Sequence, residues 1–190
     1  MFFKKRVIEI LNKSFRKLIS QEEIQAKIKS LATQINKEYE GRELLFIGVL
    51  DGSFMFLSDL LKHITLSCKI TFVKLKSYEG MESNGRVREL VGLDYPIDNK
   101  NILILEDIID TGKTMDYLIH VINKNKPLSI AIATLFFKPT KFLGNFPPTY
   151  TCFSISDSFI VGYGLDYEGY GRNLTSIYQH KGNTQTLPLC

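Results

Sequence analysis

Four short apolar runs are the feature that most limits how this chain can fold. They span residues 44–50, 70–75, 101–105 and 130–137, and polar or helical segments separate them. Each run is shorter than an average helix, and a strand that is apolar along its whole length is buried on both faces. Strands that alternate with helices in this way predict an α/β fold, with a mostly parallel twisted sheet and helices on both faces. Shorter strands are expected at 159–162 and 176–178.

Helical signals fill the segments between these runs. Ser20 and Glu23 have the spacing of a capping box, so a helix is expected to begin there and to end near Gly41. Further helices are expected at 54–63 and from Lys113 to about Asn123. Residues 1–19 are predicted to form a helical extension, docked on the body or on a second subunit, because apolar residues recur in it at helical spacing. Those residues are Val7, Ile8, Leu11, Phe15 and Leu18.

Length and composition limit the class of protein. A chain of 190 residues predicts one domain, here 20–190, with the extension 1–19 before it. Hydrophobic residues make up 44% and charged residues 23%, which excludes a disordered chain, and a net charge of +4 is too small to indicate nucleic acid. The three cysteines, Cys68, Cys152 and Cys190, form no disulfide or zinc pattern. No run approaches the roughly 18 apolar residues of a membrane span. A cytoplasmic protein without a membrane partner is therefore expected.

The run ILILEDIIDTGKT, residues 102–114, carries the strongest chemical signal. Glu106 and Asp107 follow an apolar strand, and Asp110 lies in the turn before a predicted helix. The free backbone N–H groups of a helix start, beside a glycine that permits close approach, suit a phosphate monoester. Adjacent carboxylates suit Mg²⁺ and the hydroxyl groups of a sugar. Each acid alone is typical of a cap or a solvated strand end, but the three together favour a functional site.

A nucleoside-triphosphate P-loop is an alternative reading of Gly112, Lys113 and Thr114. That motif requires a glycine five positions before the Gly-Lys pair. Position 107 is an aspartate, so the motif is absent.

Residues 102–114 closely resemble the phosphoribosyl-diphosphate signature of the type I phosphoribosyltransferases, and the form EDIIDTGKT resembles the hypoxanthine branch of that family. The resemblance continues over nearly the whole chain after about Lys17. It implies the family fold, with a small hood and a mobile lid loop over residues 77–91. It also implies an IMP-forming enzyme of purine salvage that uses phosphoribosyl diphosphate, a 6-oxopurine such as hypoxanthine or guanine, and Mg²⁺. Relatives are dimers or tetramers, so a homodimer or homotetramer is expected.

The resemblance assigns each candidate residue a role. The pyrophosphate loop is Leu50, Asp51, Gly52 and Ser53, joined by Arg172. The phosphoribosyl group is expected at Glu106, Asp107, Asp110, Thr111, Gly112, Lys113 and Thr114. The lid begins at Ser77 and Tyr78. The purine is expected at Lys138, Phe159, Ile160 and Asp166, and the metal at Glu106, Asp107 and Asp166.

Within this scheme Asp110 is the general base that takes the purine N7 proton, and Lys138 donates to the purine O6. Adenine carries an amino group at that position, so Lys138 would discriminate against it. Phe159 would stack on the base, and Ile160 would offer only backbone groups. One departure from the family pattern is that Asp51 stands where many relatives carry Lys or Arg, so a favourable side-chain contact to pyrophosphate is not expected from that position.

Two other functions are compatible with such a sequence. A regulator of nucleic acid can use the same fold, with the cluster Lys4-Lys5-Arg6 as its contact, but the retained Asp110 and Lys138 argue against this. An enzyme that takes xanthine or a pyrimidine is the other alternative.

Overall fold

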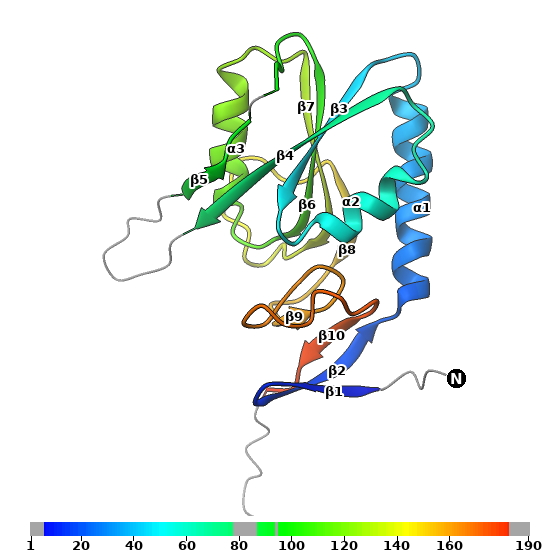
Figure 1. Cartoon of the computed structure of the whole chain (residues 1–190), viewed down its shortest axis with the longest axis vertical. Helices are drawn as coiled ribbons and strands as arrows, with labels where there is room; N and C mark the ends of the chain where they lie inside the picture. Colours follow the sequence, from blue (N-terminus) through cyan, green and yellow to red (C-terminus); the bar gives the residue numbers. More distant parts are fainter. Residues whose placement is uncertain (1–5, 78–86, 94, 183–190) are drawn as a thin grey trace, which may run out of the picture.

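The core of the molecule is a six-stranded sheet within the residues that the computed structural model describes, 6–77, 87–93 and 95–182. Its order is β5-β4-β3-β6-β7-β8 (Figure 1). The strands are β3 (Leu44–Leu50), β4 (Cys68–Ser77), β5 (Val87–Val91), β6 (Asn101–Ile109), β7 (Ser129–Phe137) and β8 (Tyr150–Ser154). All neighbouring pairs are parallel except β4 and β5. The predicted mostly parallel sheet is confirmed.

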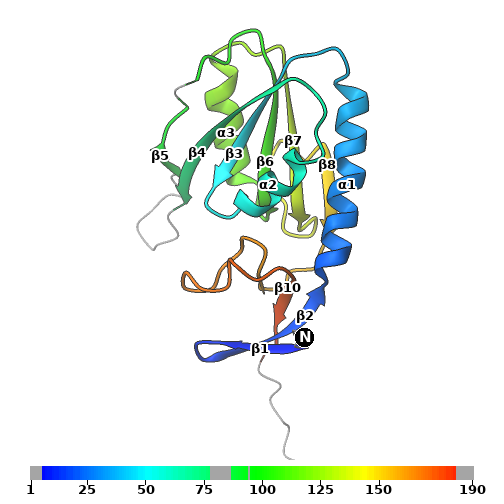
Figure 2. The same ribbon diagram turned by 45° about the vertical axis from the view of Figure 1, so that its right-hand side comes forward.

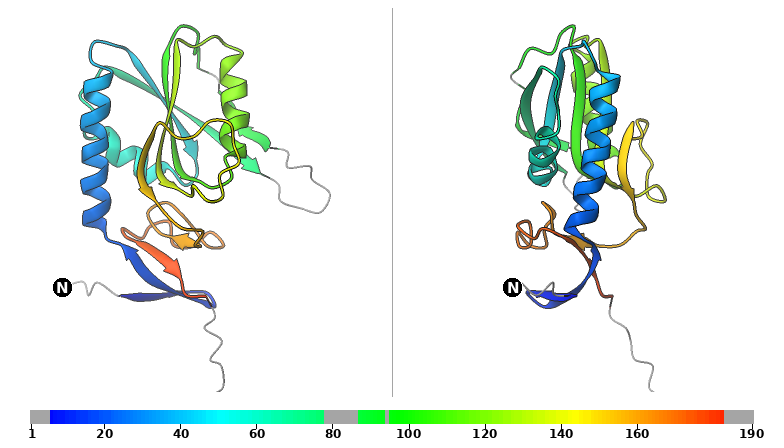
Figure 3. Two further views of the ribbon diagram at one scale, coloured as in Figure 1. Left: turned by 180° about the vertical axis from the view of Figure 1, so that it is seen from behind. Right: turned by 90° about the vertical axis from the view of Figure 1, so that its right-hand side faces the viewer.

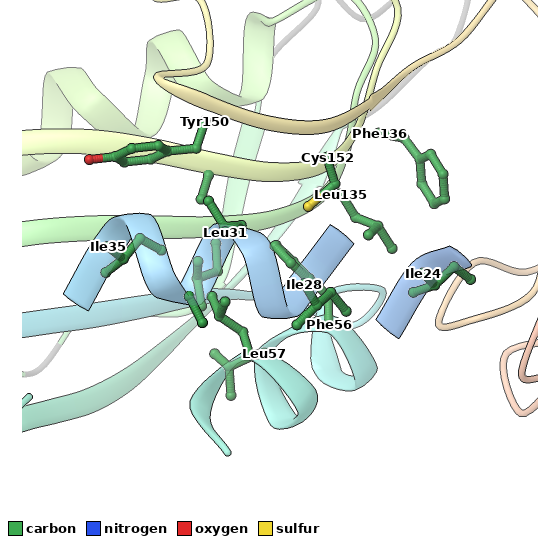
Figure 4. Close-up of a cluster of buried hydrophobic side chains, with 14 of the residues drawn as sticks. Ile24, Ile28, Leu31, Ile35, Phe56, Leu57, Leu135, Phe136, Tyr150 and Cys152 are labelled. Atoms are coloured by element: carbon green, nitrogen blue, oxygen red, sulfur yellow. The ribbon is translucent and has the colours of Figure 1, made fainter. Parts of the chain in front are cut away.

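Helices cover both faces of this sheet, as predicted. The helices α1 (Gln21–Glu38) and α2 (Phe54–Leu61) lie on one face, and α3 (Lys113–Asn123) lies on the other (Figures 2 and 3). Alternate side chains of β3 serve the two faces. Leu44 and Phe46 join the cluster with α1 and α2, whereas Leu45 and Ile47 join the cluster with α3. Figure 4 shows the apolar stripe of α1 packed against α2 and the neighbouring strands.

The capping box at the start of α1 is confirmed. The Ser20 hydroxyl accepts from the Glu23 backbone N–H at 3.2 Å, and the Ser20 backbone N–H donates to the Glu23 carboxylate at 2.8 Å. The helix ends at Glu38, shortly before the predicted Gly41. No helix of the described residues is long and apolar enough to cross a membrane.

A second, smaller sheet lies beyond the carboxyl ends of the main strands and corresponds to the expected hood (Figure 1). Its order is β1-β2-β10-β9, and its neighbouring strands are antiparallel. The strands are β1 (Val7–Ile10), β2 (Lys13–Ile19), β9 (Ile160–Val161) and β10 (Ile177–His180). The sheet therefore joins both ends of the described chain.

The predicted N-terminal helix is wrong, because these residues form the hairpin β1–β2. Strand β2 pairs with β10 from the far end of the chain, with Phe15 opposite His180 and Ile19 opposite Ile177. Phe15 and Ile19 are buried, whereas Leu11 and Leu18 of the supposed helical stripe are exposed. The period of two that β2 uses was thus hidden by apolar residues that face solvent.

The expected long loop over residues 77–91 is also corrected in part. Residues Val87–Val91 form β5, which pairs with the end of β4. Residues 78–86, which include Tyr78, lie outside the described residues, so the lid expectation concerns chain that the structure does not describe. Strand β6 continues beyond the predicted end at Leu105 to Ile109. Glu106 and Asp107 therefore belong to the strand itself, and Ser77 is the last residue of β4.

Candidate active site

A cavity of about 350 Å³ opens beyond the carboxyl ends of β3 and β6. This is where ligands bind in open parallel sheets. Its polar lining comes from three separated segments: the turn after β3, the end of β6 with the start of α3, and the loop between β9 and β10. The candidate residues that line it are Leu50, Asp51, Gly52, Glu106, Asp107, Asp110, Thr111, Gly112, Thr114, Asp166 and Arg172. The structure thus brings together most residues predicted to bind the phosphoribosyl and pyrophosphate groups.

The turn after β3 packs directly against the acids of β6. A Cβ atom added to Gly52 would lie only 1.5 Å from a carboxylate oxygen of Asp107, so glycine is needed for this approach. Ser53 is fully buried, and its hydroxyl donates to the Val49 carbonyl at 2.6 Å. Ser53 therefore stabilises the turn through this hydrogen bond and does not line the cavity.

Glu106 and Asp107 are two acids with little to neutralise them. Burial, and then the charge of Asp107, raise the pKa of Glu106 well above its usual range, and burial raises the pKa of Asp107 as well. Backbone N–H groups give partial support: that of Asp107 donates to Glu106 at 3.1 Å and that of Ile108 donates to Asp107 at 2.7 Å. Such a pair favours either a shared proton or a bound cation.

The raised pKa of Glu106 predicts how stability depends on pH. A carboxyl group whose pKa is higher in the folded than in the unfolded state stabilises the fold below its unfolded pKa, and this contribution is lost as the pH rises through the folded pKa. We expect Glu106→Gln to remove this loss. In metal-free buffer, its melting temperature relative to wild type should therefore be higher at pH 8 than at pH 5. A difference that stays constant across this range would contradict the raised pKa.

The phosphate loop is built around Gly112. This residue is the N-cap of α3 with φ of +84°, and an added Cβ would lie 2.5 Å from the Phe142 ring. Thr111, Gly112 and Thr114 line the cavity at the helix start, where free N–H groups attract an anion. Lys113 is exposed and does not line the cavity, so its side chain points to a different environment from that of Thr114.

Asp110 has one occupied and one unused carboxylate oxygen. Its Oδ2 accepts from Lys138 Nζ at 3.2 Å. Its Oδ1 is buried and, among the described residues, has no hydrogen-bond partner. A buried acceptor without a partner costs folding free energy, which is tolerated where a ligand supplies the partner. Asp110 thus has the geometry of a residue that receives a proton or a hydrogen bond from a substrate.

Lys138 belongs to a cluster of two lysines and two aspartates that includes Asp110. Lys138 is only 7% exposed, and its Nζ also lies 3.5 Å from Asp157. Lys141 pairs with Asp157 at 2.8 Å and approaches Asp110 at 3.8 Å. The hydrogen bond from Lys141 lowers the pKa of Asp157. Sequence reasoning missed Asp157, since no local pattern marks it.

Two of the residues expected at the purine, Phe159 and Ile160, come from the hood and are not among those that line the cavity. Ile160 is buried in β9. Phe159 is 47% exposed, and its ring contacts Tyr167 and Phe15 with centroids 5.9 and 6.2 Å apart. Lys13 Nζ lies 4.2 Å from the Tyr167 ring and 5.7 Å from that of Phe159. The N-terminal hairpin therefore supports the aromatic residue that is expected to stack on the base.

The loop between β9 and β10 supplies the last charged pair. Arg172 is bonded to Asp166 at 2.6 Å and donates to the Gly164 carbonyl at 2.7 Å. Gly164 lies against the turn after β3, where an added Cβ would lie 2.0 Å from the Gly52 carbonyl oxygen. This packing fixes Asp166 and Arg172 beside the predicted pyrophosphate loop.

The comparisons with known proteins agree on one family. The family model for the phosphoribosyl transferase domain matches residues 19–168. The hypoxanthine-guanine phosphoribosyltransferase of Streptococcus mutans is 40% identical over 170 residues, which cover 88% of this chain and 94% of that protein. Its counterpart in Bacillus subtilis is 41% identical over 161 residues, which cover 84% and 89%.

Solved structures agree in fold. A crystal structure of a hypoxanthine phosphoribosyltransferase from Staphylococcus aureus has a TM-score of 0.83 and 40% identity, and the match covers 87% of this chain and 91% of that one. A hypoxanthine phosphoribosyltransferase from Trypanosoma cruzi, a mutant in complex with its ternary substrates, has a TM-score of 0.81 and 34% identity, over 87% and 94% of the two chains. The resemblance seen in residues 102–114 is confirmed, and this chain belongs to the type I phosphoribosyltransferase family, in its hypoxanthine-guanine branch.

Proposed function

We propose that this enzyme transfers the 5-phosphoribosyl group of phosphoribosyl diphosphate to N9 of hypoxanthine, and also of guanine, in purine salvage. The products are IMP or GMP and pyrophosphate. The observation that carries the proposal is the unused, buried Oδ1 of Asp110. It lies between a helix start suited to a phosphate and a buried lysine suited to a purine carbonyl.

Each end of the substrate is assigned to one part of the cavity. The backbone N–H groups at Thr111, Gly112 and Thr114 bind the 5-phosphate. Glu106 and Asp107 hold the ribose hydroxyls, directly or through a metal ion. Pyrophosphate lies against the turn at Asp51 and Gly52, beside Arg172.

The donor set fits Mg²⁺. Within the described part of the chain no three His, Cys, Asp or Glu side chains group into a site that would hold a metal by themselves. Mg²⁺ usually takes only one or two protein carboxylates and completes its shell with water and phosphate oxygens. The uncompensated pair Glu106–Asp107 supplies such ligands, with Asp166 nearer the pyrophosphate. When bound, Mg²⁺ neutralises charge that develops on the leaving pyrophosphate.

The protein's own groups then account for the transfer. The bond from the ribose anomeric carbon to the pyrophosphate oxygen breaks with its electron pair on pyrophosphate. The N9 lone pair of the purine forms the new bond, and the N7 proton passes to Asp110. Lys138 donates to O6 and so orients the base, while Phe159 stacks on its face.

The direct test is product formation with phosphoribosyl diphosphate, Mg²⁺ and each of hypoxanthine, guanine, xanthine and adenine, followed by chromatography of the nucleotides. We expect IMP and GMP, and at most traces of AMP, because adenine would face Lys138 with a donor. EDTA should stop the reaction and added Mg²⁺ should restore it. Absence of turnover with every 6-oxopurine would contradict the proposal.

A further inference from the structure

The cavity has an unbalanced set of charges for a ligand as anionic as pyrophosphate. Its lining includes the acids Asp51, Glu106, Asp107, Asp110 and Asp166. Arg172 is the one basic side chain among the described lining residues, and it is already bonded to Asp166 and to a backbone carbonyl. A further cation near the turn after β3 would help to balance the charge of such a ligand.

Lys74 is placed to be that cation. It lies in β4, where it is the register partner of Leu50, the last residue of β3. Its Nζ donates to both carboxylate oxygens of Asp51, each at 2.8 Å. An ammonium group has three N–H donors. Within the described residues, the third N–H of Lys74 has no partner.

The ion pair between Lys74 and Asp51 contributes little to the stability of the fold. The Lys74 and Asp51 side chains are 36% and 50% exposed, and ion pairs of this exposure contribute little to folding. The pair instead places a positive group beside Asp51, which lines the cavity. An acid at position 51 would by itself repel a polyanion. Joined to Lys74, it becomes an anchor that orients an ammonium group.

We propose that Lys74 is a pyrophosphate-binding residue and that Asp51 positions it by accepting two of its three N–H bonds. The third N–H then binds an oxygen of the pyrophosphate group. This inference rests on the proposed function, which places pyrophosphate at the turn after β3. It assigns the cation of this end of the site to β4 rather than to the turn itself.

The first test compares Lys74→Met with Lys69→Met. Lys69 lies on the same strand and is also in an exposed ion pair, with Glu43 at 3.1 Å, but at the opposite end of the sheet. Binding of pyrophosphate with Mg²⁺ is measured by calorimetry, and KM is measured for both substrates. Loss of a charged hydrogen bond should weaken pyrophosphate binding and raise KM for phosphoribosyl diphosphate about tenfold or more. KM for hypoxanthine should change far less, and Lys69→Met should match wild type.

Exchange of the charges gives a second, independent test. Lys74→Asp places two acids together and should weaken pyrophosphate binding more than Lys74→Met does. The double variant Asp51→Lys with Lys74→Asp restores the pair in the opposite order, so it should recover most of the lost affinity. Asp51→Lys alone keeps a cation at this place and should bind pyrophosphate at least as tightly as wild type.

The outcomes separate this inference from the proposed function. If Lys74→Met, Lys69→Met and wild type bind pyrophosphate equally, Lys74 is only a surface ion pair and the inference is wrong. If wild type forms no IMP yet loses pyrophosphate affinity in Lys74→Met, the proposed function is wrong while the binding role stands. If wild type does not bind pyrophosphate with Mg²⁺, both are wrong.

Discussion

Asp110→Asn is expected to lower kcat by about 10²–10⁴-fold, the range over which general-base catalysis acts. Asparagine keeps the volume of the side chain and still offers an oxygen to Lys138, which now donates to Oδ2 at 3.2 Å. It cannot accept a proton at the position of the unused Oδ1. Steady-state rates with hypoxanthine and phosphoribosyl diphosphate test this, and a melting curve checks that the fold is retained.

Asp157→Asn is the matched control for that variant. Asp157 forms ion pairs with the same two lysines as Asp110, at 3.5 Å from Lys138 and 2.8 Å from Lys141, but it does not line the cavity. If Asp110 acts as a base, Asp157→Asn should retain most of the wild-type kcat. Equal losses in the two variants would show that Asp110 matters only as a partner of Lys138, and so would a kcat near wild type in Asp110→Asn.

The site could be predicted from the sequence where its residues are neighbours in the chain. The apolar start of β6, its acids and the glycine before α3 fall within residues 102–114, so one segment specifies strand, turn, helix start and chemistry. The apolar run ends at Leu105, so the sequence predicts the acids after the strand, and carboxylates are seldom buried. The fold keeps them inside β6, at a cost visible in their raised pKa values. Departures of this kind from folding preference are typical of functional sites.

The features that the sequence did not predict depend on pairing between segments that are distant in the chain. Strand β2 of the hairpin pairs with β10, more than 150 residues later, and no pattern in residues 7–19 indicates that partner. The ion pair of Lys74 with Asp51 depends likewise on the register of β3 against β4. A single sequence shows which residues alternate along a strand but not which strand lies beside it. The contacts of Lys13 with Tyr167, of Lys74 with Asp51 and of Asp157 with Lys138 therefore became visible only in the structure.

Lys138→Ala is expected to raise KM for hypoxanthine by about 10–100-fold, because it removes a hydrogen bond from a charged donor to the purine O6. KM for phosphoribosyl diphosphate should change much less, since Lys138 follows β7 and is not among the described residues that line the cavity. Initial rates measured with each substrate varied in turn test this. Similar increases in both KM values would contradict base recognition.

A variant of the neighbouring Lys141 distinguishes recognition of the purine by Lys138 from a general effect of positive charge near Asp110. Lys141 approaches the same two acids as Lys138, but its side chain is 42% exposed against 9% for Lys138. Lys141→Ala therefore removes a positive charge from this cluster without removing the buried donor. If Lys138 donates to the purine O6, only Lys138→Ala should weaken hypoxanthine binding strongly. The preference of this variant for hypoxanthine over adenine should also fall. A buried donor left unpaired is the source of such a preference. Once the donor is gone, neither base leaves a group unsatisfied, so discrimination should fall together with affinity.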